Sequence, residues 1–239
     1  MNRINQLFQE KSHHILSLYF CAGHPSLHST ADIIRTLASR GIDMIEIGIP
    51  FSDPMADGPV IQDAATKALK NGMNLRLLFS QLKDIRFGFE EFCRECQACG
   101  IDGMIFPDLP FKDYLNDFKP IADKYDLRII MLITPETSDE RIRFIDDHTD
   151  GFIYMVSSAA VTGAQKSFDE RKQTYFSHVQ SLNLTHPRMI GFGISNKQTL
   201  ESAYNNASGA IIGSRFVQYL DEYKSADLAL DRLMEALKR

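Results

Sequence analysis

Residues 46–58 read EIGIPFSDPMADG and place a charged residue inside a segment that otherwise has the composition of a buried β strand. Successive side chains of a strand point to opposite faces, so Ile45, Ile47 and Ile49 face one side while Glu46 faces the other. Burying an unpaired carboxylate costs several kcal/mol, so a glutamate at this position needs either a partner or a chemical role.

The residues after this strand predict a loop with acidic side chains. Two prolines and Gly58 interrupt regular structure, and Asp53 and Asp57 place two carboxylates in the same loop. A carboxylate at a strand end, followed by such a loop, is typical of the catalytic face of a parallel α/β barrel. A Mg²⁺ site formed by Glu46, Asp53 and Asp57 is the alternative, because several carboxylates on one loop suit a hard cation.

Length and composition favour one α/β barrel domain that extends over residues 1–239. The 239 residues are 44% hydrophobic and 24% charged, which is ordinary for a globular protein. The net charge of -5 argues against nucleic acid as the main partner. A phosphorylated small molecule remains compatible with it, because backbone amides hold phosphate without a net positive charge.

Neither a membrane span nor a secretory signal is indicated. No apolar run approaches the roughly 18 residues that a bilayer crossing needs, and the first 14 residues, MNRINQLFQEKSHH, lack an apolar core. We therefore expect a cytoplasmic protein with no membrane partner.

Three of the four cysteines, Cys93, Cys96 and Cys99, follow helical spacing. A metal or cluster site would need a fourth ligand and turn residues nearby, which this segment lacks. Reduced cysteines on a partly buried helix face are the favoured interpretation.

Apolar runs typical of strands alternate with helical patterns along the chain, which predicts parallel strands with right-handed crossovers. The expected strands are 15–21, 43–49, 101–107, 127–134, 151–156, 188–192 and 208–213. The expected helices are 28–40, 60–70, 75–85, 88–98, 112–124, 138–146, 196–204 and 225–238.

One strand of a standard barrel is missing from this pattern. The helix that ends near Arg86 is followed at once by another helical segment, so seven strands are predicted where a barrel has eight. Either the protein has lost its third strand, or about 15 to 20 residues are missing at the Arg86–Phe87 junction. We favour missing residues, because losing an internal strand exposes unpaired backbone groups.

Two late strand ends carry glycines: 191–195 reads GFGIS and 209–214 reads GAIIGS. The loops after strands seven and eight of a barrel commonly bind phosphate, which makes Gly193, Gly213 and Ser214 candidate ligands. Each glycine alone is equally well explained by a tight turn. Residues 157–167, SSAAVTGAQKS, suit a lid in which Thr162 and Gly163 reach the site, or an ordinary surface loop.

The chain resembles the α subunits of tryptophan synthase over nearly its whole length. The matching segments, in the family's order, are EIGIPFSDPMADGPVIQ, PDLP, FIYMVSSAAVTG, GFGIS and GAIIGS. The resemblance implies a (βα)8 TIM barrel with an extra N-terminal helix. It also implies a carbon–carbon lyase of tryptophan biosynthesis that cleaves indole-3-glycerol phosphate to indole and glyceraldehyde 3-phosphate.

The resemblance further implies that this chain holds no cofactor and works in an α2β2 heterotetramer, whose β subunit carries pyridoxal phosphate. By motif position it implies roles for twelve residues. The catalytic positions are Glu46, Asp57 and Tyr154. The substrate contacts are Thr162, Gly163, Gly193, Gly213 and Ser214, and the expected walls of the indole site are Phe20, Ile105, Ile133 and Phe192.

The lid motif departs from the family, because Ser158 stands where many members carry arginine and Ala160 replaces the following glycine. The absent segment supplies, in the family, the third strand and part of the indole site. A non-catalytic subunit that binds and activates the β subunit is therefore the alternative function. A related phosphate-binding barrel, such as an isomerase or indole-glycerol-phosphate synthase, fits the 46–58 segment poorly.

Overall fold

The computed structural model describes residues 1–51, 57–74, 77–78, 89–107, 111–157 and 170–238. Its strands are β1 (Ile15–Cys21), β2 (Met44–Gly48), β3 (Gly103–Ile105), β4 (Arg128–Ile133), β5 (Ile153–Val156), β6 (Arg188–Gly191) and β7 (Gly209–Ile212). The N-terminal helices are α1 (Arg3–Glu10), α2 (Thr30–Ser39), α3 (Pro59–Lys70), α5 (Phe89–Ala98), α6 (Phe111–Asp113), the π-helix η1 (Tyr114–Phe118) and α7 (Lys119–Lys124). The later helices are α8 (Asp139–His148), α9 (Glu170–Ser181), α10 (Lys197–Asn206), α11 (Ser214–Tyr223) and α12 (Ala226–Lys238).

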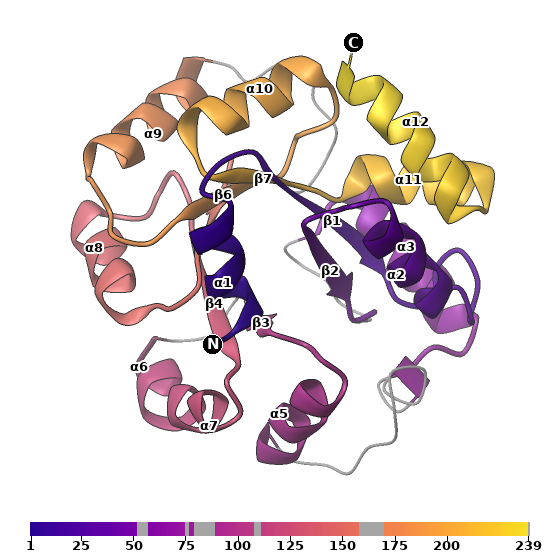
Figure 1. The fold of residues 1–239 in the computed structure, drawn as a ribbon, viewed down its shortest axis with the longest axis horizontal. Coiled ribbons are helices and arrows are strands. Elements are labelled where there is room, and N and C mark those ends of the chain that lie inside the picture. Colours follow the sequence, from indigo (N-terminus) through magenta and orange to yellow (C-terminus); the bar gives the residue numbers. More distant parts are fainter. Residues whose placement is uncertain (52–56, 75–76, 79–88, 108–110, 158–169, 239) are drawn as a thin grey trace.

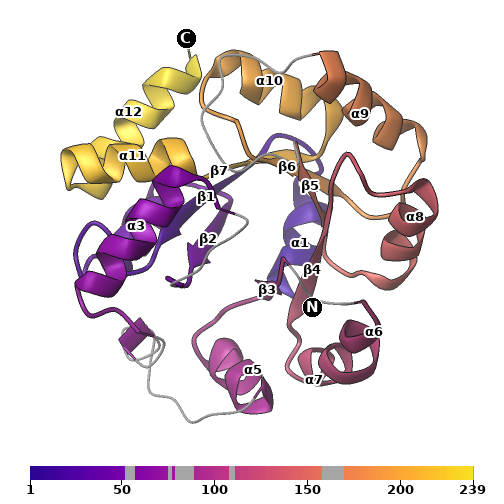
Figure 2. The same cartoon turned by 180° about the vertical axis from the view of Figure 1, so that it is seen from behind.

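The seven strands form one curled parallel sheet with the order β2-β1-β7-β6-β5-β4-β3. The helices surround the sheet on its outer side, as both views of the ribbon show (Figures 1 and 2). This is the α/β barrel architecture that the alternating pattern predicts. Among the described strands, β2 and β3 are the two edges, and residues 52–56 and 79–88, which lie between them in the sequence, are outside the described residues.

Helix α1 lies across the N-terminal ends of the strands. The Asn2 side chain donates hydrogen bonds to the carbonyl oxygens of Asp102 and Asp126, which precede β3 and β4. Asn5 donates to the Asp150 carboxylate, before β5, at 2.6 Å. Ile4 packs in the apolar cluster inside the sheet. The extra N-terminal helix therefore closes the end of the barrel opposite the candidate site.

The two faces of the sheet bury different apolar clusters. The inner cluster takes residues from successive strands, including Ile15, Ile130, Tyr154 and Met189. The outer cluster lies between the sheet and the helices and includes Phe20. Both faces of most strands are apolar, as expected when helices cover one side of a parallel sheet and side chains fill the other.

The sequence patterns locate most elements to within a few residues. Helix α9 was not among the expected helices, because its buried residues Tyr175, Phe176 and Val179 form only a short stripe within a polar segment. The expected helix 112–124 is interrupted by η1. The expected helix 75–85 lies almost entirely outside the described residues. No helix in the described ranges combines the length and apolarity of a membrane span.

The structure confirms that the cysteines of α5 are reduced residues on a partly buried helix face. Cys93 and Cys96 are buried on the inner face of the helix, and all four cysteines of the chain are free. Burial raises the pKa of Cys93 to about 11 and that of Cys96 to about 12, so both thiols are protonated at neutral pH.

Replacing Asn2 tests how α1 closes the barrel. Asn2→Ala removes two donations to strand-leading carbonyls and the N-cap acceptor for the Ile4 amide. We expect the free energy of unfolding to fall by about 1–3 kcal/mol, measured by denaturant titration. Gln6→Ala, which removes only an exposed hydrogen bond to Glu10, is the control. Equal losses in the two variants would contradict this account.

Candidate active site

Glu46 occupies the middle of β2 on the inner face of the sheet. In the parallel pairing of β1 with β2, Tyr19 is its partner, and the two side chains lie on the same face. Burial is the main cause that raises the pKa of Glu46 to about 7, and the negative charge of Asp57 adds to it. A carboxyl group with this pKa exchanges its proton near neutral pH, which suits a general acid and base.

Asp57 is held at the start of α3. Gly58 is the N-cap of this helix, Pro59 begins it, and the Gln62 side chain donates to the Asp57 carbonyl oxygen at 2.8 Å. Burial raises the pKa of the Asp57 carboxyl. Its charge acts on Glu46 and on three more groups of the inner face, Tyr19, Cys21 and Tyr154. The Asp57 carboxylate therefore lies close enough to the inner face of the sheet for its charge to act there.

Tyr154 of β5 faces the same space from across the barrel. Its ring is 5% exposed, and burial together with the charge of Glu46 raises its pKa well above the usual value. The phenol is therefore a neutral hydrogen-bond donor at physiological pH. Gly191 is required beside it, because a Cβ there would lie 2.3 Å from the Tyr154 hydroxyl oxygen. Phe192 meets the ring edge-on, with the ring centroids 6.1 Å apart.

The predicted phosphate ligands lie at the ends of β6 and β7. Gly213 is the N-cap of α11 and has no side chain with which to cap the helix, and Ser214 is the first residue of the helix. The first amides of α11 are thus available to an anion. Gly193 follows Phe192 with a φ of 81°, in the left-handed region. Ser157 fixes this turn by donating to the Phe192 carbonyl oxygen at 2.7 Å.

Two of the expected wall residues lie elsewhere. Phe20 and Ile133 are fully buried in the outer cluster, between the sheet and the helices, so the structure separates them from Glu46. Their neighbours Tyr19 and Leu132 face inward instead. Leu132 is paired with Tyr154 and packs against the inner cluster. The expected wall residue Ile105 does pack in this cluster, as does Phe192.

Tyr19 was not predicted from the sequence as a site residue. Its side chain lies between the segment 46–58 and the segment 209–214. A Cβ at Gly48 would lie 2.0 Å from the Tyr19 hydroxyl oxygen, and one at Gly213 would lie 3.3 Å from the Tyr19 Cβ. The Tyr19 side chain therefore reaches from Gly213, at the start of α11, to Gly48, at the end of β2. Pairing with Glu46 across the β1–β2 ladder is the signal that identifies it, and this register is visible only in the folded sheet.

Four residues of the lid lie outside the described residues: Ser158, Ala160, Thr162 and Gly163. So does Asp53, which the Mg²⁺ alternative needs. In the part of the chain that the structure describes, no group of three or more His, Cys, Asp or Glu side chains could hold a metal ion.

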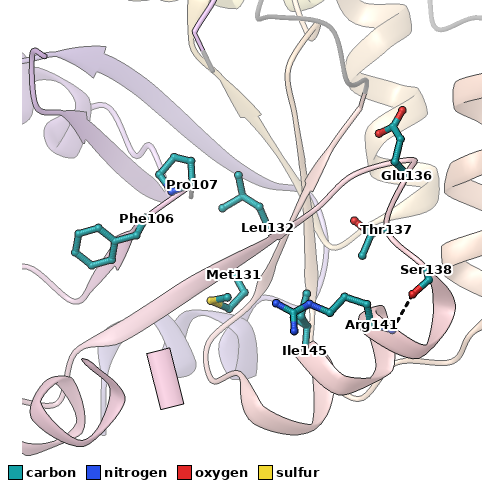
Figure 3. Close-up of a pocket in the computed structure, with 9 residues that line it drawn as sticks. All are labelled: Phe106, Pro107, Met131, Leu132, Glu136, Thr137, Ser138, Arg141 and Ile145. Carbon is teal, nitrogen blue, oxygen red and sulfur yellow. Dashed lines mark hydrogen bonds between the residues drawn. The ribbon is translucent and has the colours of Figure 1, made fainter. Parts of the chain in front are cut away.

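A cavity of about 380 Å³ lies at the C-terminal end of β4. Figure 3 shows Phe106 and Pro107 on one side of it and Ser138 and Arg141, at the start of α8, on the other. Leu132 contributes to both this cavity and the inner cluster. The residues that line this cavity do not include Glu46, Asp57 or Tyr154.

Comparison with known proteins gives one consistent family. The family described as "Tryptophan synthase alpha chain" matches residues 5–238. The chain is 63% identical to the tryptophan synthase alpha chain of Phocaeicola vulgatus, over all of both chains. It is 60% identical to that of Bacteroides fragilis, covering 99% of this chain and 97% of the relative. The tryptophan synthase A-subunit of Pyrococcus furiosus superposes with a TM-score of 0.83 at 31% identity, covering 94% and 98% of the two chains.

The alignment with a relative contains internal positions at which this chain has no residue. The alignment with the Phocaeicola vulgatus protein spans 257 positions, so at least 18 of them have no residue among the 239 present here. This number agrees with the size of the segment expected to be missing at the Arg86–Phe87 junction.

The elevated pKa of Glu46 predicts a pH-dependent stability difference. Its ordinary value is 4.5 and its folded value about 7, so between these pH values the folded state binds more protons than the unfolded state. Stability therefore falls as pH rises through this window. Glu46→Gln has no titrating carboxyl at this position and does not lose stability in this way. The free energy of unfolding of this variant, minus that of the unmodified chain, should therefore increase by about 1–3 kcal/mol from pH 4.5 to pH 8.

Chemical denaturation at the two pH values measures this difference. Glu170→Gln, on an exposed position of α9, is the matched control and should show no such trend. A difference for Glu46→Gln that is the same at both pH values would show that the buried carboxyl does not titrate in this range.

Proposed function

The chain belongs to the tryptophan synthase alpha chain family, and on that premise we propose that Glu46, Asp57 and Tyr154 carry its chemistry at the C-terminal end of the sheet. The family's reaction is the cleavage of indole-3-glycerol phosphate, a lyase step of tryptophan biosynthesis. The observation that carries the proposal is the pair of unequal carboxyls, one with a pKa near 7 and the other beside it.

The reaction needs two proton transfers around one carbon–carbon bond. A proton added to indole C3 makes the ring a better leaving group. Loss of the proton from the adjacent glycerol hydroxyl then forms the aldehyde as the bond breaks, and the electron pair of that bond restores the aromatic ring. Glu46 donates the first proton and accepts the second, because its pKa allows both states near neutral pH.

Asp57 has a different role in this mechanism. Protonation at C3 places positive charge on the indole nitrogen, and an ionised Asp57 accepts the N–H hydrogen bond and stabilises that charge. Its environment supports the division of roles, since Glu46 is more strongly desolvated than Asp57. Tyr154, kept neutral by burial, donates a hydrogen bond that orients the Glu46 carboxylate.

The substrate's two ends bind on opposite sides of this pair. Ile105, Leu132 and Phe192 form apolar walls for the indole, with Tyr19 closing the side next to β2. Gly193, Gly213 and Ser214 hold the phosphate. Binding energy from this remote group keeps the reacting bond in register. The roles of Thr162 and Gly163 in lid closure remain part of the proposal.

An alpha chain is, by its name, one component of a complex with a beta chain. We propose an α2β2 assembly in the cytoplasm, in which residues 1–239 act as one barrel domain. Pyridoxal phosphate belongs to the beta chain in this proposal, and the alpha chain works without a cofactor.

A second function remains, that of a non-catalytic subunit which activates the beta chain. The observation that favours it is that, among the described strands, β2 and β3 are edges of the sheet, and Glu46 lies on β2. Indole release by the isolated chain separates the two functions, because an activating subunit releases none.

Substitution of the two carboxyls tests the mechanism. Glu46→Gln removes the proton carrier and should lower indole release at least about 10²–10⁴-fold. Asp57→Asn should lower it severely, because a neutral amide does not stabilise the developing charge. Asp63→Asn, on an exposed turn of α3, controls for loss of a carboxylate and should leave the rate unchanged. Substantial release by folded Glu46→Gln protein would end this account of the mechanism.

Adjacent residues of β1 offer a test of which strand face meets the substrate. Tyr19→Ala opens the inner face and should raise the KM for indole-3-glycerol phosphate about tenfold or more. Phe20→Leu disturbs only the outer layer and should lower the free energy of unfolding by about 1 kcal/mol with KM unchanged. Steady-state kinetics and denaturant titration of both variants check this, and the reverse pattern would place Phe20 in the site.

A further inference from the structure

Strand β1 lies between the two strands that lead to opposite ends of the proposed substrate. The sheet order β2-β1-β7 places it beside β2, which carries Glu46, and beside β7, which leads to Gly213 and α11. Figure 2 shows β1 between these two neighbours. An inward-facing side chain near the C-terminal end of β1 therefore lies between the acid–base residue and the first amides of α11.

Tyr19 provides this side chain. In the ladder with β2 it is paired with Glu46, and the two side chains share the inner face. A Cβ at Gly213 would lie 3.3 Å from the Tyr19 Cβ, whereas a Cβ at Gly48 would overlap the Tyr19 hydroxyl oxygen. The ring therefore begins beside the cap of α11. Its hydroxyl ends beside Gly48, two residues or about 7 Å beyond Glu46 along β2.

The Tyr19 hydroxyl is open to a ligand. It makes no hydrogen bond within the described part of the chain, and its oxygen is not among the buried polar atoms that lack a partner. The Tyr175 hydroxyl, by contrast, is both unpartnered and closed off from solvent. Burial of the Tyr19 side chain is the main cause that holds its pKa well above the usual value. The group is therefore a neutral hydrogen-bond donor at physiological pH.

Neither carboxylate of the site accepts the Tyr19 proton in this structure. The charges of Asp57 and Glu46 both raise the pKa of Tyr19, so the three groups share one space. No hydrogen bond among the described residues joins the Tyr19 hydroxyl to either carboxylate. The phenol that the proposed mechanism assigns to Glu46 is Tyr154, on β5. The reaction as proposed therefore leaves the Tyr19 hydroxyl without a role.

The proposed substrate carries one hydroxyl that the reaction does not use. In indole-3-glycerol phosphate, the carbon bonded to the indole bears the hydroxyl that becomes the aldehyde, and the last carbon bears the phosphate. The middle carbon bears a second hydroxyl, which is still present in glyceraldehyde 3-phosphate. With the phosphate at the cap of α11 and the reacting carbon at Glu46, the middle carbon lies along the Tyr19 side chain.

We propose that the Tyr19 hydroxyl donates a hydrogen bond to the middle hydroxyl of the glycerol chain, which makes Tyr19 a residue that distinguishes the glycerol chain from a chain without this group. The inference rests on the proposed substrate. The middle hydroxyl takes no part in bond cleavage, so the contact has the same strength before and during the reaction. It therefore lowers KM and leaves kcat unchanged.

Two uncleavable ligands that differ by one hydroxyl test this contact. The first, 2-hydroxy-3-(indol-3-yl)propyl phosphate, keeps the middle hydroxyl and lacks the reacting one, and the second, 3-(indol-3-yl)propyl phosphate, lacks both. Titration calorimetry gives the Kd of each ligand for the unmodified full chain and for Tyr19→Phe, which keeps the ring. Tyr19→Phe should weaken binding of the first ligand about threefold to tenfold, as expected for one lost hydrogen bond. The Kd of the second ligand should stay the same.

Tyr125→Phe is the matched control. It removes a phenol hydroxyl at the C-cap of α7, where the group donates to Glu90, and should leave both Kd values unchanged. Equal losses for the two ligands in Tyr19→Phe would overturn the proposal, because the loss would then come from the ring and not from the hydroxyl. Unchanged binding of both ligands would also overturn it. So would a lower kcat without a ligand-specific loss, because the hydroxyl would then act on the carboxylates.

The proposed reaction fails in a different way. Indole release from indole-3-glycerol phosphate depends on Glu46, whereas neither ligand carries the hydroxyl that Glu46 deprotonates. A ligand-specific loss in Tyr19→Phe, without indole release by the unmodified chain, would count against the reaction and leave the hydroxyl contact standing. Indole release without a ligand-specific loss would do the opposite. If the unmodified chain binds neither ligand, the proposed substrate and the contact are both wrong.

Discussion

The register between β1 and β2 is the constraint on which the site depends. Pairing Tyr19 with Glu46 sets which face of each strand points inward, and a shift by one residue would exchange every inner side chain for an outer one. In this register the Glu46 side chain points to the inner face of the sheet, and burial is the main cause that raises its pKa to about 7. The same register places Phe20 among the helices. Position and protonation of the glutamate therefore have one structural origin.

Room for the aromatic side chains comes from glycines that the sequence motifs suggest for another purpose. Gly191 belongs to the GFGIS stretch that suggests a phosphate-binding turn, and its missing side chain makes space for the Tyr154 ring. Gly48 does the same for Tyr19. Gly193 lies in a left-handed turn after β6, and Gly213 is the N-cap of α11, where backbone amides are accessible to a ligand. One glycine-rich pattern thus contains two physical roles, close packing and access to backbone amides.

The sequence predicts some residues of this site and not others, because hydrophobic patterns reveal charged residues in strands but not which face of a strand points inward. Glu46 stands out in the sequence because a charged residue in an apolar run is an anomaly of burial, and Asp57 stands out as a carboxylate of the loop that follows this run. Phe20 and Ile133 were expected inside, but both faces of a buried parallel strand are apolar, so ILSLYFC does not reveal which face is inner. Strand order and the missing strand could be predicted from alternation, whereas α9, with a weak stripe, could not.

The states of the two carboxyls follow from where each residue lies on the chain. Glu46 lies in the middle of β2, and burial is the main cause that raises its pKa to about 7, with the charge of Asp57 as the second cause. Asp57 lies directly before α3, where burial raises the pKa of its carboxyl. An ionised Asp57 favours the protonated form of Glu46, because a second negative charge nearby costs energy. In the proposed reaction, protonation of indole C3 draws on that form, so the charge of Asp57 supports both the proton donor and the positive indole nitrogen.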